Sequence, residues 1–281
     1  VVLPDYLMDV TAVANCFKSY GTEPDLHLLN KLKRFTSSPA LMLGNIANFF
    51  LDELVNHKEA NFDELFIKVF KLNPLAFALM DDSTLMEIRD KARTHFLNLQ
   101  KVISENLLAL DIDPNTLVLE PSFYSQKYGI QGRLDALALG DNDINSIIEL
   151  KSGKIFKPNH DGINSNHYIQ TLLYDLLVRS VYGTRVKSMN YILYSALIER
   201  SLRYATPSNA SQMEAIQIRN NMLALEEKLC QLLPNNDLAL STLDSVLSTE
   251  RLTKVSGYEA SDLQTYEELS ASFSNFEKTY F

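Results

Sequence analysis

Two acidic residues and a lysine lie where the two strands of a predicted hairpin can bring them together. Asp135 is on the first strand, and Glu149 and Lys151 are on the second. Residues two apart on a strand point to the same face of a sheet, and antiparallel pairing can place Asp135 at the same end. Two acids and a lysine on one face are costly unless a cation lies between the carboxylates.

Such a cluster predicts a site for Mg2+ or Mn2+, with Asp135 and Glu149 as ligands, because these ions prefer carboxylate oxygens, carbonyls and water. The ion would polarise a phosphate and lower the pKa of a bound water, while Lys151 would orient that water or stabilise a pentavalent phosphate. The alternative is that the triplet 149–151 is an ordinary solvated segment. The apolar pair at 147–148 favours the functional interpretation, because it indicates a buried strand.

A small sheet and one helix must position these residues. The order strand, helix, strand implies a crossover connection and therefore a mixed sheet. The sequence predicts an extended segment at 115–124, a hairpin of strands 131–139 and 145–151 with a turn at 140–143, a helix at 164–182 and a strand at 187–195.

Helices are expected on either side of this sheet. The first 110 residues are predicted to be helical, with apolar residues near a 3.6-residue period at 38–57. Asn61 is the expected N-cap of the next helix, and 83–110 is predicted as one long helix, broken at most once. From 208 to 281 the chain is again predicted to be helical, with a break at 232–237. The fold class is α/β, a small mixed central sheet flanked by many helices.

Composition narrows the classes of function. The chain has 281 residues, 46% of them hydrophobic, and a formal net charge of −9. That charge counts against a broad basic face for nucleic acid, although a site can be locally basic and a metal ion offsets carboxylates. Lys151, Lys154 and Lys157 form such a basic strip.

Cellular context follows from what the sequence lacks. Cys16 and Cys230 are the two cysteines, too few for a disulfide framework or a cysteine-built metal centre. No apolar run approaches the length of a membrane span, and no signal peptide is recognisable, so we expect a cytoplasmic protein that does not bind membrane. The chain does not begin with Met and is expected to be part of a larger protein.

Three segments together resemble one nuclease family. GRLDAL (132–137), IIELKSGK (147–154) and HYIQTLLYDLL (167–177) are similar, in order and spacing, to the core of the RecB-like PD-(D/E)XK nucleases. Within that superfamily the chain most resembles the nuclease domain of helicase–nucleases that trim single-stranded flaps, and the CRISPR adaptation nucleases are relatives. LMLGNIANFFLDEL (41–54) resembles the first helix of that domain, and the resemblance spans roughly residues 38–225.

The resemblance implies a restriction-endonuclease-like core and a Mg2+- or Mn2+-dependent deoxyribonuclease. It would act on single-stranded ends or flaps in DNA repair, replication or recombination, with a helicase in the full-length protein. The regions would be 1–112, N-terminal helices; 113–200, catalytic core; and 201–281, C-terminal helices packed on the core, together one nuclease domain. The resemblance also implies a role for each site residue. Asp135 and Glu149 would bind the metal, Lys151 would assist the attacking water, and Glu120 would be a further acid near the metal. Gln170 and Tyr174 would position the phosphate or the strand, and Arg133, Lys154 and His167 would contact nucleic acid.

Two departures from the family pattern bear on activity. Asn48 stands where the family usually has a metal-binding His, and the four cysteines of the flap-processing branch are missing, so no iron–sulfur cluster is expected. Asn48 favours an alternative, a degenerate nuclease fold that binds DNA for a helicase partner and does not cut. A structural scaffold is a third interpretation, favoured by the acidic net charge.

Overall fold

The computed structural model describes residues 1–33, 38–57, 59–140, 144–183 and 185–278. The chain divides into two compact units, each assembled from separated stretches of sequence. We call them the terminal unit (Val1–Phe35, Tyr124–Gln131 and Ser208–Phe281) and the sheet unit (Thr36–Phe123 and Gly132–Pro207). The division of the sequence at 112 and 200 stays a prediction. The predicted turn at 141–143 lies outside the described residues.

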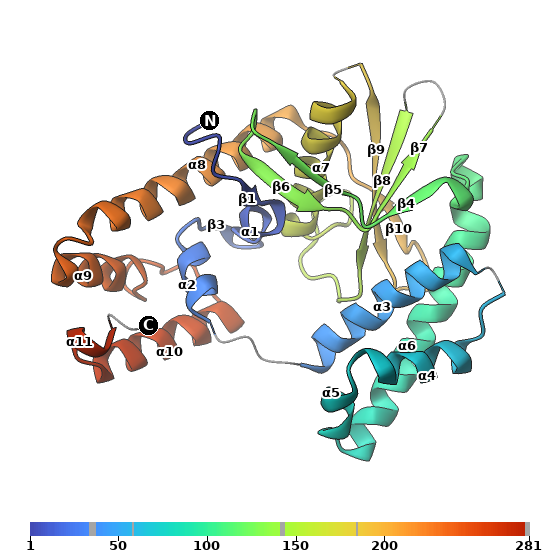
Figure 1. Ribbon diagram of the computed structural model, residues 1–281, viewed down its shortest axis with the longest axis horizontal. Helices are drawn as coiled ribbons and strands as arrows, with labels where there is room; N and C mark the ends of the chain where they lie inside the picture. Colours follow the sequence, from blue (N-terminus) through green and yellow to red (C-terminus); the bar gives the residue numbers. More distant parts are fainter. Residues whose placement is uncertain (34–37, 58, 141–143, 184, 279–281) are drawn as a thin grey trace. The chain divides into compact units, whose positions relative to one another are not determined.

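The sheet unit is built on a five-stranded sheet in the order β10-β9-β8-β7-β4 (Figure 1). β7 and β8 pair antiparallel, and β8 and β9 pair parallel with Lys151 opposite Tyr194. The predicted hairpin and mixed sheet are therefore confirmed. The strands are β4 (Leu117–Leu119), β7 (Ala136–Leu139), β8 (Ile144–Lys151), β9 (Lys187–Tyr194) and β10 (Leu202–Tyr204).

The predicted single strand at 131–139 is wrong, because the chain breaks after β6 (Ile130–Arg133) and resumes at β7. At the break Leu134 is fully buried, and its N–H donates to the carbonyl of Pro121. β6 belongs to a different sheet, in the order β1-β6-β5, so the two halves of the predicted strand have different partners. An alternating pattern does not reveal which strand a segment will pair with.

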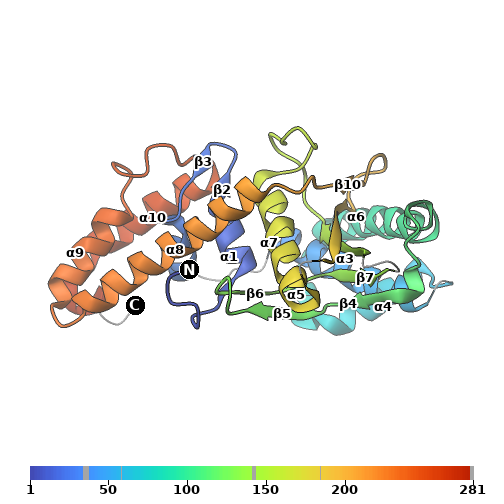
Figure 2. The ribbon, with the colours of Figure 1, turned by 90° about the horizontal axis from the view of Figure 1, so that it is seen from above.

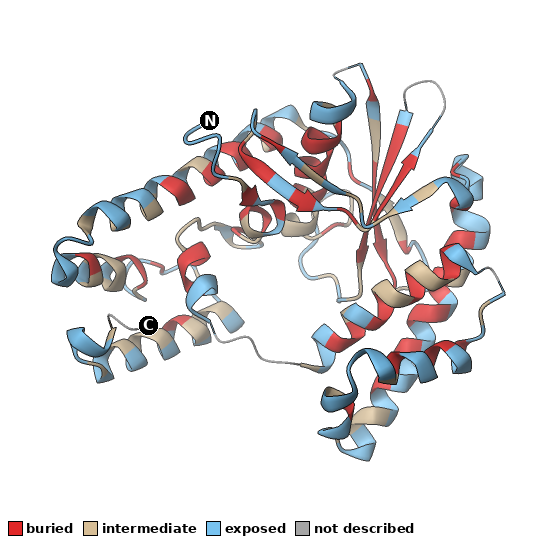
Figure 3. Cartoon of the chain, in the orientation of Figure 1, coloured by how far each residue is buried: buried red, intermediate tan, exposed pale blue. Residues whose placement is uncertain are grey.

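Helices cover both faces of the five-stranded sheet, as the fold class predicts. Ile148 and Leu150 of β8 join the apolar core formed with α3 (Pro39–Asn56) and α6 (Asp82–Lys101). Side chains alternate along a strand, so Glu149 faces the opposite side, where it bonds to α7 (Ser165–Tyr182). Figure 3 shows the buried residues concentrated along the central strands.

The helices on the α3 side begin at the caps that their sequences encode. Ser38 Oγ accepts from Leu41 N at 3.2 Å to start α3. Asn61 Oδ1 accepts from Asp63 N at 2.8 Å, confirming the predicted N-cap. The predicted long helix at 83–110 is also confirmed with one break: α6 continues as π-helix Val102–Asn106 and then 3-10 helix Leu108–Leu110. The remaining elements here are α4 (Phe62–Leu72), α5 (Pro74–Ala78) and the 3-10 helix Pro114–Thr116.

The terminal unit is mainly helical, and leucines from four of its helices share one core. Figure 2 shows α8 as its longest helix. The predicted helix break at 232–237 is confirmed between α8 and α9. Its helices are α1 (Val10–Ala14), α2 (Leu26–Leu32), α8 (Asn209–Leu232), α9 (Asn236–Val246), α10 (Tyr258–Ser272) and α11 (Asn275–Lys278).

The prediction of helix throughout the first 110 residues is wrong near the N-terminus, which contains three two-residue strands. They are β1 (Met8–Asp9), β2 (Phe17–Lys18) and β3 (Gly21–Thr22), while β5 covers Ser122–Ser125. β1 pairs parallel with β6, Met8 opposite Ile130. A partner so distant in sequence leaves no local periodicity to read.

A buried arginine holds the terminal unit together. The Arg219 side chain on α8 is completely buried and donates to the carbonyls of Leu3 at 2.9 Å, Tyr6 at 2.5 Å and Gly129 at 3.0 Å. Burial lowers its pKa. A guanidinium carries five donors in a fixed fork, so one side chain can join three segments.

Candidate active site

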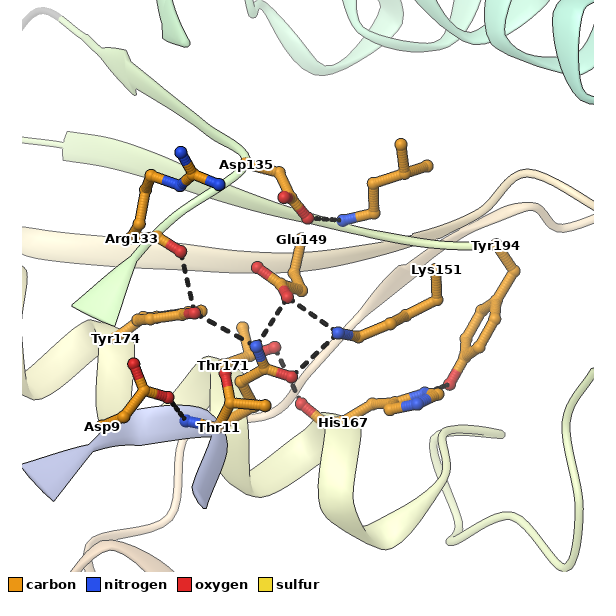
Figure 4. Close-up of polar contacts among 12 residues, drawn as sticks. Asp9, Thr11, Arg133, Asp135, Glu149, Lys151, His167, Thr171, Tyr174 and Tyr194 are labelled. Carbon is orange, nitrogen blue, oxygen red and sulfur yellow. Dashed lines mark hydrogen bonds and ion pairs between the residues drawn. The ribbon is translucent and has the colours of Figure 1, made fainter. Parts of the chain in front are cut away.

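Asp135 and Glu149 meet beside the paired strands β7 and β8. Asp135 directly precedes Ala136, which lies opposite Ile148 in the antiparallel register. Its Oδ2 accepts from the main-chain N–H of Leu150 at 2.6 Å. This hydrogen bond fixes the Asp135 carboxylate against the strand that carries Glu149, as drawn in Figure 4.

One carboxylate oxygen of Glu149 is saturated and the other is not. Glu149 is 3% exposed, and its Oε1 accepts from Lys151 Nζ at 2.8 Å and from Gln170 Nε2 at 2.7 Å. Its Oε2 is buried and has no hydrogen-bond partner among the described groups. A buried acceptor left unpaired costs about 1–3 kcal/mol, so this oxygen is suited to a ligand.

The surroundings of Asp135 disfavour its ionised form. The pKa of Asp135 is raised well above its ordinary 3.8, first by burial and then by the negative charge of Glu149, while Lys151 acts in the opposite direction. A proton or a cation is therefore needed beside Asp135 to neutralise the pair.

A chain of hydrogen bonds from side chains on α7 holds the Lys151 ammonium in position. The Gln170 carbonyl oxygen accepts from Lys151 Nζ at 2.9 Å, and Gln170 Nε2 donates to Tyr174 Oη at 3.1 Å. Tyr174 Oη in turn donates to the carbonyl of Arg133 at 2.9 Å. Gln170 and Tyr174 are four residues apart and so share one face of the helix, and both are almost fully buried.

His167 lies at the start of this helix and bonds to the end of β9. Its Nδ1 is 3.0 Å from Tyr194 Oη, which accepts from Asn164 N at 3.2 Å. The pKa of His167 is lowered to about 3, by burial first and by the charge of Lys151 second. His167 is therefore a neutral group at ordinary pH, and its contact with nucleic acid remains a prediction.

Glu120 and Arg133 pair with each other at the edge of the site. Arg133 Nη1 is 3.1 Å from Glu120 Oε2, and both side chains are well exposed. Glu120 adopts a left-handed backbone, with φ of +50°, and its N–H donates to the carbonyl of Asp135 at 3.0 Å. The main chain of Glu120 thus holds Asp135, while its carboxylate points to Arg133. Lys154 is exposed on the loop after β8.

Sequence reasoning missed Asp52 on α3. Its pKa is raised to about 6, by burial first and then by the charges of Glu120 and Asp135. Asp52 therefore adds a third acid to the surroundings of Asp135. The available signal was its position one helical turn after Asn48, on the same face of α3. Tyr194 and Asn164 were also missed, because only the β8–β9 register brings Tyr194 opposite Lys151.

The residues present suit a hard divalent cation. Within the described ranges, no three His, Cys, Asp or Glu side chains gather closely enough to enclose a metal ion by themselves. Asp135 and Glu149 nevertheless supply two carboxylates, one of them with a buried and unpartnered oxygen. Mg2+ is commonly bound through one or two carboxylates, with water and substrate completing its shell.

Comparisons with known proteins identify similar chains among curated sequences and solved structures. No protein-family model matches the chain. The chain is 26% identical over 246 residues to the DNA replication ATP-dependent helicase/nuclease dna2 of Schizosaccharomyces pombe, covering 79% of this chain and 16% of that protein. It also matches a crystal structure provisionally named an exonuclease, from Eubacterium rectale, at 14% identity and a TM-score of 0.46, covering 78% of this chain and 79% of that one.

Within the parts of the chain that the structure describes, each helix is too short or too polar to cross a membrane.

Proposed function

We propose that this chain is a divalent-metal-dependent nuclease of the PD-(D/E)XK type that hydrolyses phosphodiester bonds in DNA. The observation that carries the proposal is the buried, unpartnered Oε2 of Glu149 beside Asp135, with Lys151 on the same face of the sheet. Similarity to a DNA replication helicase/nuclease supports DNA as the substrate and a helicase as partner. Single-stranded ends or flaps are the form of DNA that we propose, on the resemblance of the sequence motifs to flap-processing nucleases.

Asp135 and Glu149 are the residues that would hold Mg2+ or Mn2+, whose contribution when bound is Lewis-acid polarisation of the phosphate and of the attacking water. Lys151 supplies a positive charge, held by Glu149 Oε1 and the Gln170 carbonyl oxygen, for the charge that develops on the phosphate. Tyr174 keeps Gln170 in the orientation that this requires. Because Glu149 and Gln170 are buried, water is excluded from the contact between β8 and α7 on which Lys151 rests.

The first test is cleavage of end-labelled single-stranded DNA with Mn2+, with Mg2+ and with EDTA, comparing the parent with Lys151→Ala. Lys68→Ala is the matched control, because Lys68 is an exposed lysine paired with Glu53 on the α3 side of the sheet. We expect metal-dependent cleavage by the parent and the control, and loss of cleavage in Lys151→Ala with the fold intact by circular dichroism. Cleavage by Lys151→Ala at the parent rate would show the site assignment to be wrong.

A second candidate is a DNA-binding module that holds DNA for a helicase without cutting. Asn48 favours it, since a neutral amide stands where the family's His would bind metal. Tight binding of single-stranded DNA by folded protein, with no cleavage under any metal, would support this candidate over the enzyme.

A further inference from the structure

The loops that follow β8 and β9 leave the same edge of the sheet, because these two strands are parallel and Lys151 lies opposite Tyr194. The first loop, 152–164, leads into α7, and the second, 195–201, leads into β10. Arg203 joins them: it donates to the carbonyl of Gly162 in the first loop and to that of Arg200 in the second. Both loops therefore begin beside the strand end that carries Lys151.

Phe156 is an aromatic side chain that the first loop exposes to solvent. Its exposed fraction is 70%, whereas its neighbour Ile155 packs on the cluster of Ile163, Ile192 and Tyr194. Single exposed apolar residues are common and carry no inference by themselves. Phe156 differs because the backbone beneath it is held in place.

The side chain of Asn164 holds this backbone in place. Its side-chain oxygen accepts from Phe156 N at 2.8 Å, and its side-chain nitrogen donates to the carbonyl of Lys154 at 3.4 Å. Its own N–H donates to Tyr194 Oη at 3.2 Å. The backbone of Phe156 is thereby connected to the strand end that lies opposite Lys151.

Charge around Phe156 favours a polyanion. Lys154 and Lys157 flank it, both exposed, and neither forms an ion pair with any side chain that the structure describes. Lys157 also has a left-handed backbone, with φ of +43°. A non-glycine residue in that region costs about 1 kcal/mol or more and is often retained where it serves function. Two unpaired cations beside an exposed aromatic ring, whose backbone is held by Asn164, match alternating phosphates and bases.

We propose that Phe156 is a stacking platform for an unpaired nucleobase of single-stranded DNA, with Lys154 and Lys157 binding the adjoining phosphates. The platform rests on the proposed function and deepens it, because an exposed ring accepts an unstacked base and a duplex does not offer one. A base on an aromatic ring tolerates any sequence, since every base has a π-face. The platform therefore selects strandedness, and it selects no particular sequence.

The test is binding of a fluorescently labelled oligothymidylate in EDTA, followed by fluorescence anisotropy, for the parent, three variants of Phe156 and one control variant. Phe156→Ala and Phe156→Leu remove the ring, and Leu retains most of the apolar bulk. Phe156→Trp keeps an aromatic surface. Leu79→Ala is the control. Leu79 is also an exposed apolar residue of the sheet unit, with an exposed fraction of 88%, and it is the C-cap of the short helix α5. Ring removal should weaken binding about 5- to 100-fold, with Trp and the Leu79 control close to the parent.

Single abasic substitutions along the oligonucleotide provide the second measurement. The parent should lose affinity when the stacked base is missing, and Phe156→Ala should be insensitive to the same change. Equal affinity of Phe156→Leu and the parent would overturn the platform and indicate a general apolar contact, as for a protein partner. Failure of the parent to bind the oligonucleotide, or its indifference to every abasic position, would overturn it as well.

The two proposals fail in distinguishable ways. Metal-dependent cleavage with KM unchanged in Phe156→Ala would sink the platform and leave the nuclease standing. Phe156-dependent binding by a protein that never cuts would sink the nuclease and leave the platform standing. The two measurements use different readouts, affinity in EDTA and cleavage with metal.

Discussion

The Nε2 atom of Gln170 lies 3.1 Å from the hydroxyl oxygen of Tyr174, and the direction of this hydrogen bond is determined. Tyr174 has one hydroxyl proton, which it donates to the carbonyl of Arg133. The hydroxyl must then accept from Gln170. The amide is thereby fixed with its nitrogen toward Tyr174 and its oxygen toward Lys151.

Removing this hydroxyl should impair catalysis more than DNA binding. In Tyr174→Phe the Gln170 amide loses its hydrogen bond to the hydroxyl and is held by Glu149 and Lys151 alone, so the position of the Lys151 ammonium is less firmly fixed. We expect kcat to fall about 10- to 100-fold with KM for DNA within about twofold, and the free energy of unfolding to fall by about 1–2 kcal/mol because the Arg133 carbonyl loses a donor. Steady-state kinetics and urea unfolding measure both. A rise in KM with kcat unchanged would instead identify Tyr174 as a DNA contact.

Asp52 should make the metal-free protein less stable as pH rises. Its folded pKa of about 6 lies above its ordinary 3.8, so between these values the unfolded chain releases the proton first and stability falls. Asp52→Asn should therefore be neutral near pH 4 and stabilising by about 1 kcal/mol above pH 7, a figure reduced because Asp52 is only half-buried. Urea unfolding in EDTA at both pH values measures this. Glu87→Gln is the control, since Glu87 is an exposed carboxylate paired with Lys91 and is not among the charges that raise the pKa of Asp52, so it should give no such gain.

Asn48 offers a test of how α3 lies against the site. Gly44, Asn48 and Asp52 are spaced by four residues and share a face; a Cβ on Gly44 would lie 3.4 Å from Ser152 Oγ, in the loop after Lys151. Asn48→His should raise the affinity for Mn2+, or the cleavage rate, because imidazole is a better ligand than an amide oxygen for this ion. Isothermal titration with Mn2+ measures the first. No change in either quantity would count against Asn48 as the ligand position.

Arg219 should be irreplaceable by lysine in the terminal unit. A lysine ammonium cannot reach the separated carbonyls of Leu3, Tyr6 and Gly129 together, so Arg219→Lys should cost about 2–4 kcal/mol. Hydrogen exchange should lose protection in peptides covering 2–9 and 124–131, while β8 keeps its protection. Equal loss in β8 would contradict the assignment of Arg219 to the terminal unit alone.

Local patterns in the sequence predicted the helices and the hairpin well, because caps and periodicity are properties of a few consecutive residues. The N-cap at Asn61 and the hairpin carrying Glu149 are examples. The strand break that contains Asp135 and the short strand at Met8 escaped prediction, because each depends on pairing with a segment that the local pattern does not reveal. Asp52 escaped for the same reason: its closeness to Asp135 arises from helix packing on the sheet.

The candidate site, too, was predicted where the signal is local in sequence and was missed where it depends on distant segments. The types and spacing of Asp135, Glu149 and Lys151 predicted that they lie close together, and the structure has Asp135 hydrogen-bonded to the main chain of Leu150 and Lys151 hydrogen-bonded to Glu149; their roles stay a prediction. The role of Tyr194 was beyond reach, since it requires knowing that β9 runs parallel to β8.

The discontinuous terminal unit has a consequence for how the chain folds during synthesis. The carbonyls of Leu3 and Tyr6 leave the ribosome first, yet the guanidinium that binds them is made more than two hundred residues later. The sheet unit, by contrast, has its sequence complete at Pro207. During synthesis the chain can thus assemble the five-stranded sheet while residues 2–6 still lack their partner on α8. Loop closure over such a distance is slow, so the last event in folding of the terminal unit should be the binding of the Leu3 and Tyr6 carbonyls by Arg219 of α8.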